Sequence, residues 1–128
     1  MKKRTNYPWL DEFCLQQVGA TKDYKDEWGV FRYMIGGKMF LMEGKDKYHK
    51  PIITVKLDPD FGSFLRVQYK DIVPGYYSNK VHWNSLYLQG DVPDDVVKSM
   101  IKQSYQLVFT SLSKKVQKEL VEIFGVNL

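Results

Sequence analysis

Hydrophobic and polar positions along the chain follow two periods, one typical of strands and one typical of helices. Segments in which apolar and polar residues alternate, or in which β-branched and aromatic residues are concentrated, are predicted strands. They cover residues 21–27, 30–35, 38–43, 52–57, 72–77 and 82–88. The first of these is short and highly charged, whereas the others have a clear apolar side. The chain is therefore predicted to build most of its core on a sheet.

Four segments have helical spacing and recognisable start signals. The first is expected to begin with Thr5 or Asn6 as its cap and to end near Gly19. The second begins at Asp58-Pro59, where Asp caps and Pro occupies the first turn. The third and longest begins at Pro93, and the last at Lys114. On the third helix the small residue Ser104 falls in the apolar stripe, so the helix can approach the sheet closely there.

The turns between the predicted strands indicate how the sheet is connected. Gly36-Gly37 suits a two-residue hairpin, because both positions can take positive φ. Pro74 lacks a backbone donor and so favours an edge strand or a bulge. Short connections predict a mainly antiparallel sheet, and the alternation predicts one covered face. The fold class expected is a two-layer α+β domain with helices packed on one face of the sheet, a single domain over residues 1–128.

Composition narrows the class of protein further. The 128 residues are 44% hydrophobic and 15% aromatic, enough for a core, and no window has the roughly 20 apolar residues of a membrane span. A soluble cytoplasmic protein is expected. Cys14 is the only cysteine, so the chain can form no intrachain disulfide and no thiolate metal cluster. We expect it to be a buried apolar residue rather than a nucleophile.

The net charge of +4 suggests a nucleic-acid partner, but its distribution weakens that inference. Lys2, Lys3 and Arg4 supply three of the 19 basic residues, which leaves sixteen basic against fifteen acidic from Thr5 onward. Residues 1–4 are expected to form a flexible basic tail. A surface that binds phosphates must therefore arise from local clustering of charge.

Strand alternation predicts which side chains share a face. If Phe31, Tyr33, Met39, Leu41, Ile53, Val55, Leu86 and Leu88 face the helices, the other face presents Arg32, Lys38, Phe40, Thr54, Lys56, Trp83 and Tyr87. Basic groups interleaved with aromatic rings can hold phosphates and stack bases. The same pattern is also typical of a solvated sheet face whose aromatics pack on each other.

Two loops carry further candidate residues. The loop over 44–50 contains Lys45, Lys47 and Lys50 and could act as a wing against a duplex backbone, although charged loop tips are commonly only solvated. The segment Asn79, Lys80, His82 and Trp83 could instead bind a small molecule or a protein, with Lys80 supplying charge and Trp83 a flat wall. The same four residues would equally shape a turn and bury a ring.

Catalytic and metal-binding patterns are not evident. His49 and His82 are the only histidines and have no ligand spacing, so no metal is expected. No glycine-rich phosphate loop precedes a helix, and no nucleophile-elbow motif accompanies Ser78 or Ser85. We therefore expect a protein that is not an enzyme, with no catalytic residues and no cofactor.

Several short blocks together resemble the MmcQ/YjbR family of small bacterial proteins with a CyaY-like fold. The blocks are Val73-Pro74-Gly75-Tyr76, Asn79-Lys80, His82-Trp83, Leu86 to Leu88, Gly90, Pro93-Asp94, Ser104-Tyr105, Gly37-Lys38-Met39-Phe40, and Lys56-Leu57-Asp58-Pro59 with Arg66. Leu57 departs from the pattern, in which the family usually carries Cys or a similarly small residue. The resemblance covers nearly the whole chain, to about Leu120.

The resemblance implies an antiparallel sheet with helices on one side and a proposed double-wing mode of DNA binding. Iron binding, found in CyaY-like proteins with an acidic ridge, is not expected, because the first helix offers only Asp11 and Glu12. The partner expected is DNA, with no membrane and no metal, and the chain is expected to be a monomer or weak dimer. The candidate contact residues are Lys38, Lys45, Lys47, Lys50, Lys56, Lys80, Trp83 and Tyr87.

Overall fold

The structure, a computed structural model, describes residues 5–75 and 79–124. Its elements in chain order are α1 (Leu10–Leu15), β1 (Thr21–Lys25), β2 (Val30–Ile35), β3 (Lys38–Lys45), β4 (Pro51–Lys56), α2 (Pro59–Gln68), β5 (Ile72–Pro74), β6 (Trp83–Tyr87), α3 (Asp94–Ser111) and α4 (Lys114–Phe124). The predicted basic tail at residues 1–4 lies outside the described residues. Within those described, no helix is both long and apolar enough to cross a membrane.

The six strands form one antiparallel sheet in the order β1-β2-β3-β4-β6-β5. Pro74 ends β5, which is an edge strand of the sheet. This position suits Pro74, because proline has no N–H to donate to a neighbouring strand. The β2–β3 turn uses Gly36 and Gly37 with φ of 56° and 82°, which confirms the predicted hairpin. The α+β class is therefore confirmed.

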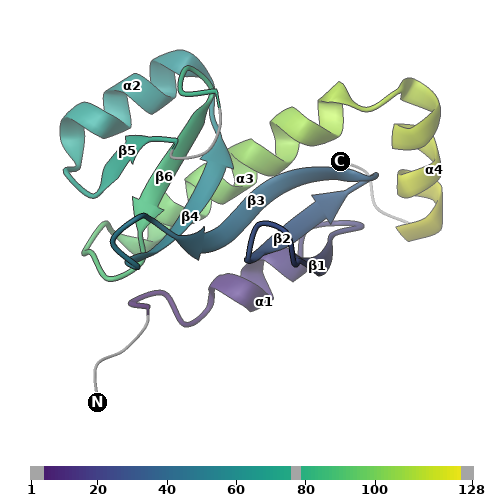
Figure 1. Cartoon of the computed structure of the whole chain (residues 1–128). Coiled ribbons are helices and arrows are strands. Elements are labelled where there is room, and N and C mark those ends of the chain that lie inside the picture. Colours follow the sequence, from purple (N-terminus) through teal and green to yellow (C-terminus); the bar gives the residue numbers. More distant parts are fainter. Residues whose placement is uncertain (1–4, 76–78, 125–128) are drawn as a thin grey trace.

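Helices cover one face of the sheet, which we call the helix side, and α3 runs along it behind the strands (Figure 1). The main core lies between α3 and the inward residues of β2, β3, β4 and β6. Met100, Ile101 and Val97 of α3 are fully buried there. The helix α4 stands at the end of α3, beside the β2–β3 hairpin (Figure 1).

The helix starts were predicted with mixed success. Asp58 caps α2 by accepting hydrogen bonds from the N–H groups of Asp60 and Phe61, as expected. Thr5 and Asn6 do not cap the first helix, which begins only at Leu10. Thr5 Oγ1 accepts from Tyr7 N–H, and Asn6 Nδ2 donates to Gly90 O, so both side chains hold the segment that precedes the helix instead.

Candidate nucleic-acid interface

The face of the sheet that carries no helix, here called the open face, is centred on β4 and β6. Lys56 pairs with Trp83, Thr54 with Ser85, and Ile52 with Tyr87, so these six side chains point to the same side. Arg32 and Met42 continue the Thr54–Ser85 row across β2 and β3. The sequence placed Arg32, Thr54, Lys56, Trp83 and Tyr87 on this face, and the register confirms their placement.

The floor of the open face is closed to solvent. Thr54 and Ser85 are buried, and their hydroxyl oxygens are 2.8 Å apart in a hydrogen bond. Lys56 and Trp83 at one end of these strands and Tyr87 at the other are only half-buried. A ligand on this face would therefore contact the side chains at the two ends of the face rather than the buried hydroxyls in its middle.

The expected face was wrong for three residues of β3, and a β-bulge is the reason. Tyr33 pairs with Leu41 but Met34 pairs with Met39, which leaves Phe40 without a partner on β2. The Phe40 ring is buried on the helix side, with its centroid 5.5 Å from that of Tyr105 in an edge-to-face contact.

The extra residue also reverses the face of the sheet on which the side chains of the two preceding residues lie. Met39, predicted to face the helices, lies opposite Met34 and so on the open face. Lys38, predicted on the open face, lies opposite the buried Ile35 and is exposed at the hairpin end on the helix side. The alternation of β3 is therefore correct only from Leu41 onward.

The loop between β3 and β4 is held together by its one acidic residue. Asp46 Oδ1 accepts hydrogen bonds from the N–H groups of Tyr48 and Lys50 at 2.8 and 2.9 Å, and Oδ2 accepts from the Tyr87 hydroxyl at 3.1 Å. Burial would raise the pKa of Asp46, but these hydrogen bonds hold it below its ordinary value. The carboxylate is therefore a fixed anchor, which sequence reasoning did not identify.

The three lysines of this loop are exposed while its backbone is anchored. Lys45, Lys47 and Lys50 all lie on the surface. The Lys50 ammonium lies 5.9 Å from the centroid of the Tyr87 ring, so this part of the loop contacts the end of β6. The loop is thus a preformed basic projection next to one end of the open face.

The alternative segment, residues 79–83, has clear structural contacts. Asn79 Oδ1 accepts from Val81 N–H at 2.9 Å, and its carbonyl accepts from Trp83 N–H at 2.8 Å, which makes it a turn residue. The His82 carbonyl accepts from Leu57 N–H at 2.7 Å and so extends the β4–β6 pairing. Lys80 is exposed beside this turn.

The eight candidate contact residues fall into two groups at opposite ends of the sheet. One end has Lys38, Lys56, Lys80 and Trp83, and the other has Lys45, Lys47, Lys50 and Tyr87. At the usual rise per residue, Trp83 and Tyr87 are about 13 Å apart along β6, and Lys38 and Lys45 are about 23 Å apart along β3. A ligand that contacts both groups must be long.

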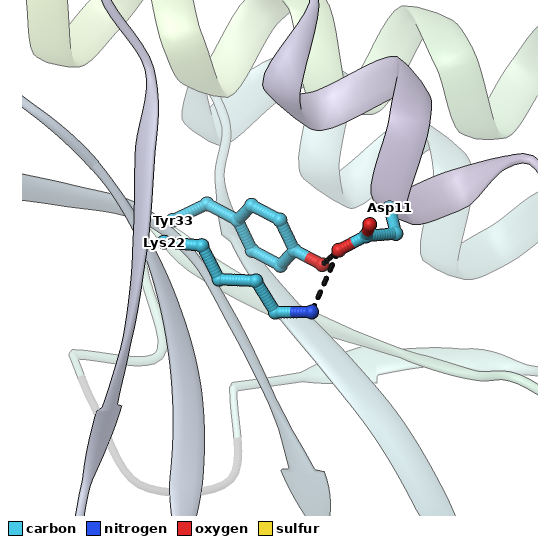
Figure 2. A network of polar contacts seen from close by, with 3 residues as sticks. All are labelled: Asp11, Lys22 and Tyr33. Atoms are coloured by element: carbon cyan, nitrogen blue, oxygen red, sulfur yellow. Dashed lines mark hydrogen bonds and ion pairs between the residues drawn. The ribbon is translucent and has the colours of Figure 1, made fainter.

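A separate polar network on the helix side joins α1 to the sheet (Figure 2). Asp11 Oδ1 accepts hydrogen bonds from the Tyr33 hydroxyl at 2.5 Å and from the Lys22 ammonium at 2.6 Å. Those bonds lower the pKa of Asp11, while burial and the bond to Asp11 raise the pKa of Tyr33. Asp11 is therefore ionised and Tyr33 neutral at physiological pH, a pairing that fixes the helix.

Beside this network, the described residues include a buried thiol but no cluster of metal ligands. Cys14 is buried next to this network, and burial together with the charges of Asp11 and Glu43 raises its pKa to about 12. Its thiolate form is scarce at neutral pH. Within residues 5–75 and 79–124, no three His, Cys, Asp or Glu side chains gather closely enough to hold a metal ion.

Comparison with known proteins places this fold and sequence in a defined group. The YjbR family model matches residues 15–107. The uncharacterised protein YjbR of Escherichia coli K12 is 28% identical over 114 residues, which cover 89% of this chain and 96% of that protein. The uncharacterised protein YbdF of Escherichia coli O157:H7 is 34% identical over 94 residues, covering 73% of this chain and 75% of that one.

Two solved structures share the fold. A Deinococcus radiodurans protein with domain DUF419 superposes with a TM-score of 0.80 and 24% identity, covering 94% of this chain and 91% of its own. A Pseudomonas syringae protein superposes with a TM-score of 0.66 and 23% identity, covering 80% of this chain and 97% of its own. At these identities the likeness establishes the common architecture and carries no information about ligands.

Proposed function

Since the chain belongs to the YjbR family, a group of small α+β proteins, we propose that it acts as a DNA-binding protein and not as an enzyme. The observation that carries the proposal is the pairing of Lys56 with Trp83 at one end of the open face, with the basic β3–β4 loop at the other end. Lysine ammonium groups would contact phosphates, and Trp83 or Tyr87 would pack against a sugar or base.

The charge distribution on the open face supports an anionic partner. Within β3, β4 and β6, all of whose residues are described, no carboxylate points to this side. On the flanking strands, Arg32 and Asp23 form a bidentate ion pair with N–O distances of 2.8 and 2.6 Å and so offset each other. The face is therefore neutral to positive in a chain whose body is nearly neutral.

The length of the surface favours a polymer over a small anion. The two groups are separated by about 13 Å along β6 and about 23 Å along β3, whereas successive phosphates of one DNA strand advance about 3.4 Å along the axis. A duplex lying along β3 and β4 would reach both ends. Contacts mainly to phosphates imply weak sequence preference and strong salt dependence.

The test is a salt titration of binding to a short random duplex, comparing the intact chain with charge-reversal variants. The double variant Lys45→Glu/Lys47→Glu should weaken binding and flatten the slope of log affinity against log salt by about 0.9 per lost contact. Lys114→Glu/Lys115→Glu, which reverses two exposed lysines at the start of α4, is the matched control and should have a much smaller effect.

Removal of residues 1–4 separates the tail from the folded body. Binding that survives the truncation and falls in the Lys45→Glu/Lys47→Glu variant would support the proposal. Binding lost on truncation would assign the phosphate contacts to Lys2, Lys3 and Arg4 alone. No binding at low salt would reject DNA and favour the alternative, a small-molecule- or protein-binding module at Asn79, Lys80, His82 and Trp83.

A further inference from the structure

A second surface feature, distinct from the open face, is a groove lined by three exposed aromatic rings, here called the aromatic groove. Tyr24, Phe31 and Glu43 form one row across β1, β2 and β3 on the helix side. Asp11 of α1 contacts the neighbouring row, at Lys22 and Tyr33. Together with Trp28 from the β1–β2 turn, the row lines a groove of about 640 Å³.

The rings are unusually accessible for their size. Tyr24 is 51% exposed, Trp28 57% and Phe31 41%. The Tyr24 and Phe31 rings meet edge to face with centroids 4.9 Å apart, so they form a fixed corner rather than independent surface side chains. The groove volume lies within the range of about 300–1,000 Å³ that small-molecule sites occupy.

The ring faces already attract ammonium groups from the same chain. Lys22 Nζ lies 4.7 Å from the Phe31 centroid, and Lys25 Nζ lies 4.7 Å from the Trp28 centroid. A cation is drawn to the negative face of an aromatic ring, and the attraction increases when the cation gives up little hydration. A quaternary ammonium group is weakly hydrated and so suits such rings better than a lysine does.

Carboxylates complete the site. Glu43 is half-buried directly opposite Phe31, and its charge contributes to the raised pKa of both Tyr33 and Cys14. Asp46 also lines the groove, in the ionised form that its hydrogen bonds favour. Lys45 is the one lysine among the lining residues that are described. The two carboxylates outnumber Lys45 in the lining, while the Lys22 and Lys25 ammonium groups add positive charge beside the Phe31 and Trp28 rings.

We propose that the aromatic groove binds a small quaternary ammonium compound of the choline type, with Tyr24, Trp28 and Phe31 around the methyl groups and Glu43 supplying the counter-charge. Tyr24, Phe31 and Glu43 lie on the other side of the sheet from the open face, although Lys45 belongs both to the groove and to the β3–β4 loop. The proposal does not depend on DNA binding. A neutral ligand of the same shape would lose both the ring attraction and the carboxylate attraction.

The experiment is an NMR titration of the full chain with choline and, separately, with 3,3-dimethylbutan-1-ol, its neutral isostere. Choline should shift the amide signals of Phe31 and Glu43 and bind about tenfold more tightly than the alcohol, since cation–π and charge contributions add. Equal binding of the two compounds, or no saturable shift with choline, would overturn the proposal.

Variants test where choline binds and whether each lining charge strengthens or weakens its binding. Glu43→Gln and Trp28→Leu should each weaken choline binding about threefold to tenfold. Lys45→Met should strengthen it, because a repelling charge is removed from the lining. Glu27→Gln, an exposed acidic residue of the same turn, is the control and should change the affinity by less than twofold. Unchanged affinity in both Glu43→Gln and Trp28→Leu would overturn the assignment.

A final comparison distinguishes a free small molecule from a modified protein. A peptide with one trimethyl-lysine should bind no more tightly than choline if the groove holds only the ammonium head. A peptide that binds while choline does not would reject the small-molecule proposal and assign the groove to a protein partner. Trp28→Leu should leave DNA affinity unchanged, so failure of either proposal can be recognised separately.

Discussion

The hydroxyl of Ser104 on α3 donates a hydrogen bond to the carbonyl oxygen of Phe40 on β3. Ser104 Oγ in turn accepts a hydrogen bond from the N–H of Lys56 on β4 at 2.8 Å. The β3–β4 pairing ends one position earlier, at Leu41 and Val55, so the serine bridges the two strands where their own ladder stops. The helix thereby satisfies two backbone groups of the sheet that it covers.

Replacing Ser104 with Ala should destabilise the fold by about 1–3 kcal/mol, because the Phe40 carbonyl and the Lys56 N–H lose their partner in a buried place. Urea unfolding measures the change in the free energy of unfolding. Ser99→Ala is the matched control on the same helix, where an exposed hydroxyl bonds only to the Asp95 carbonyl one turn earlier. Equal stability losses in the two variants would contradict the bridging role.

The β2–β3 turn offers a pair of glycines that separates backbone strain from packing. Both have positive φ, but a Cβ at Gly36 would lie 2.6 Å from Leu112 Cδ1, whereas one at Gly37 would meet nothing within 4 Å. Gly37→Ala should cost about 1–2 kcal/mol from the left-handed conformation alone. Gly36→Ala should cost about 1–3 kcal/mol more, through overlap with the buried Leu112.

Thermal unfolding of the two variants, side by side, tests this difference. Gly37→Asn serves as the control for the turn, because asparagine tolerates the left-handed region. A smaller loss for Gly36→Ala than for Gly37→Ala would mean that the end of α3 moves away from the turn at little cost.

Replacing Gly62 on α2 with Ala should change stability in the direction opposite to that expected from helix propensity. Alanine in a helix interior ordinarily stabilises it by up to about 1 kcal/mol. Here a Cβ would lie 2.9 Å from Asn84 Nδ2, and Asn84 is buried with its Oδ1 bonded to Arg66. Gly62→Ala should therefore destabilise the protein by about 1–3 kcal/mol.

A double-mutant cycle shows whether Asn84 is the cause. In an Asn84→Ala background the obstacle is gone, so Gly62→Ala should become neutral or stabilising when measured by urea unfolding. The same destabilisation in both backgrounds would mean that the helix backbone, and not the Asn84 side chain, resists the substitution.

The Asp11 network predicts a stability change in acid (Figure 2). Hydrogen bonds from Lys22 and then Tyr33 lower the pKa of Asp11 in the folded state. Its contribution is therefore fully present above the unfolded-state pKa of about 4 and is lost as pH falls through the lowered folded-state value. Asp11→Asn should reduce stability at pH 7 and have little effect at low pH.

The Asp11 effect should stay below about 1 kcal/mol, because the ion pair with Lys22 is partly exposed to solvent, which screens it. Urea unfolding at neutral pH and near pH 3 measures it. Glu12→Gln, the adjacent exposed carboxyl on α1, is the control and should show a smaller difference between the two pH values. A larger loss for Asp11→Asn in acid than at pH 7 would reverse the predicted sign.

Cys14 should be unreactive in the folded protein. Its side chain is buried, and burial is the main cause of the pKa of about 12. Alkylation by iodoacetamide at pH 8 should be at least about a hundredfold slower than in the urea-unfolded chain, because both access and the thiolate are lacking. The rate should rise with urea in parallel with unfolding. Rapid alkylation without denaturant would show that α1 opens easily.

The sequence by itself determined the elements whose signals are local. Gly36-Gly37, Asp58-Pro59 and Pro74 specify a hairpin, a helix start and an edge strand through backbone conformation and missing donors, whatever lies around them. The alternation along β4 and β6 likewise placed Lys56, Trp83 and Tyr87 on one face, because each strand has an uninterrupted period of two.

Only the tertiary structure decided features that depend on a neighbour distant in sequence. The bulge at Phe40 changes the parity of Lys38 and Met39, and it is coupled to Ser104 and Tyr105 on α3, more than sixty residues away. The first helix begins later than its caps suggested, because Asn6 bonds to Gly90 instead.

The candidate sites divide in the same way. The basic residues of the β3–β4 loop are evident from the sequence. The conformation of the loop, however, depends on the hydrogen bond that Asp46 accepts from Tyr87 of β6, 41 positions later. Strand pairing brings Tyr24 and Phe31 next to Glu43 in the aromatic groove, and the spacing of these residues in the sequence does not predict this. Local chemistry fixed the elements, and the register of the sheet decided which side chains meet, because only pairing sets distances between strands.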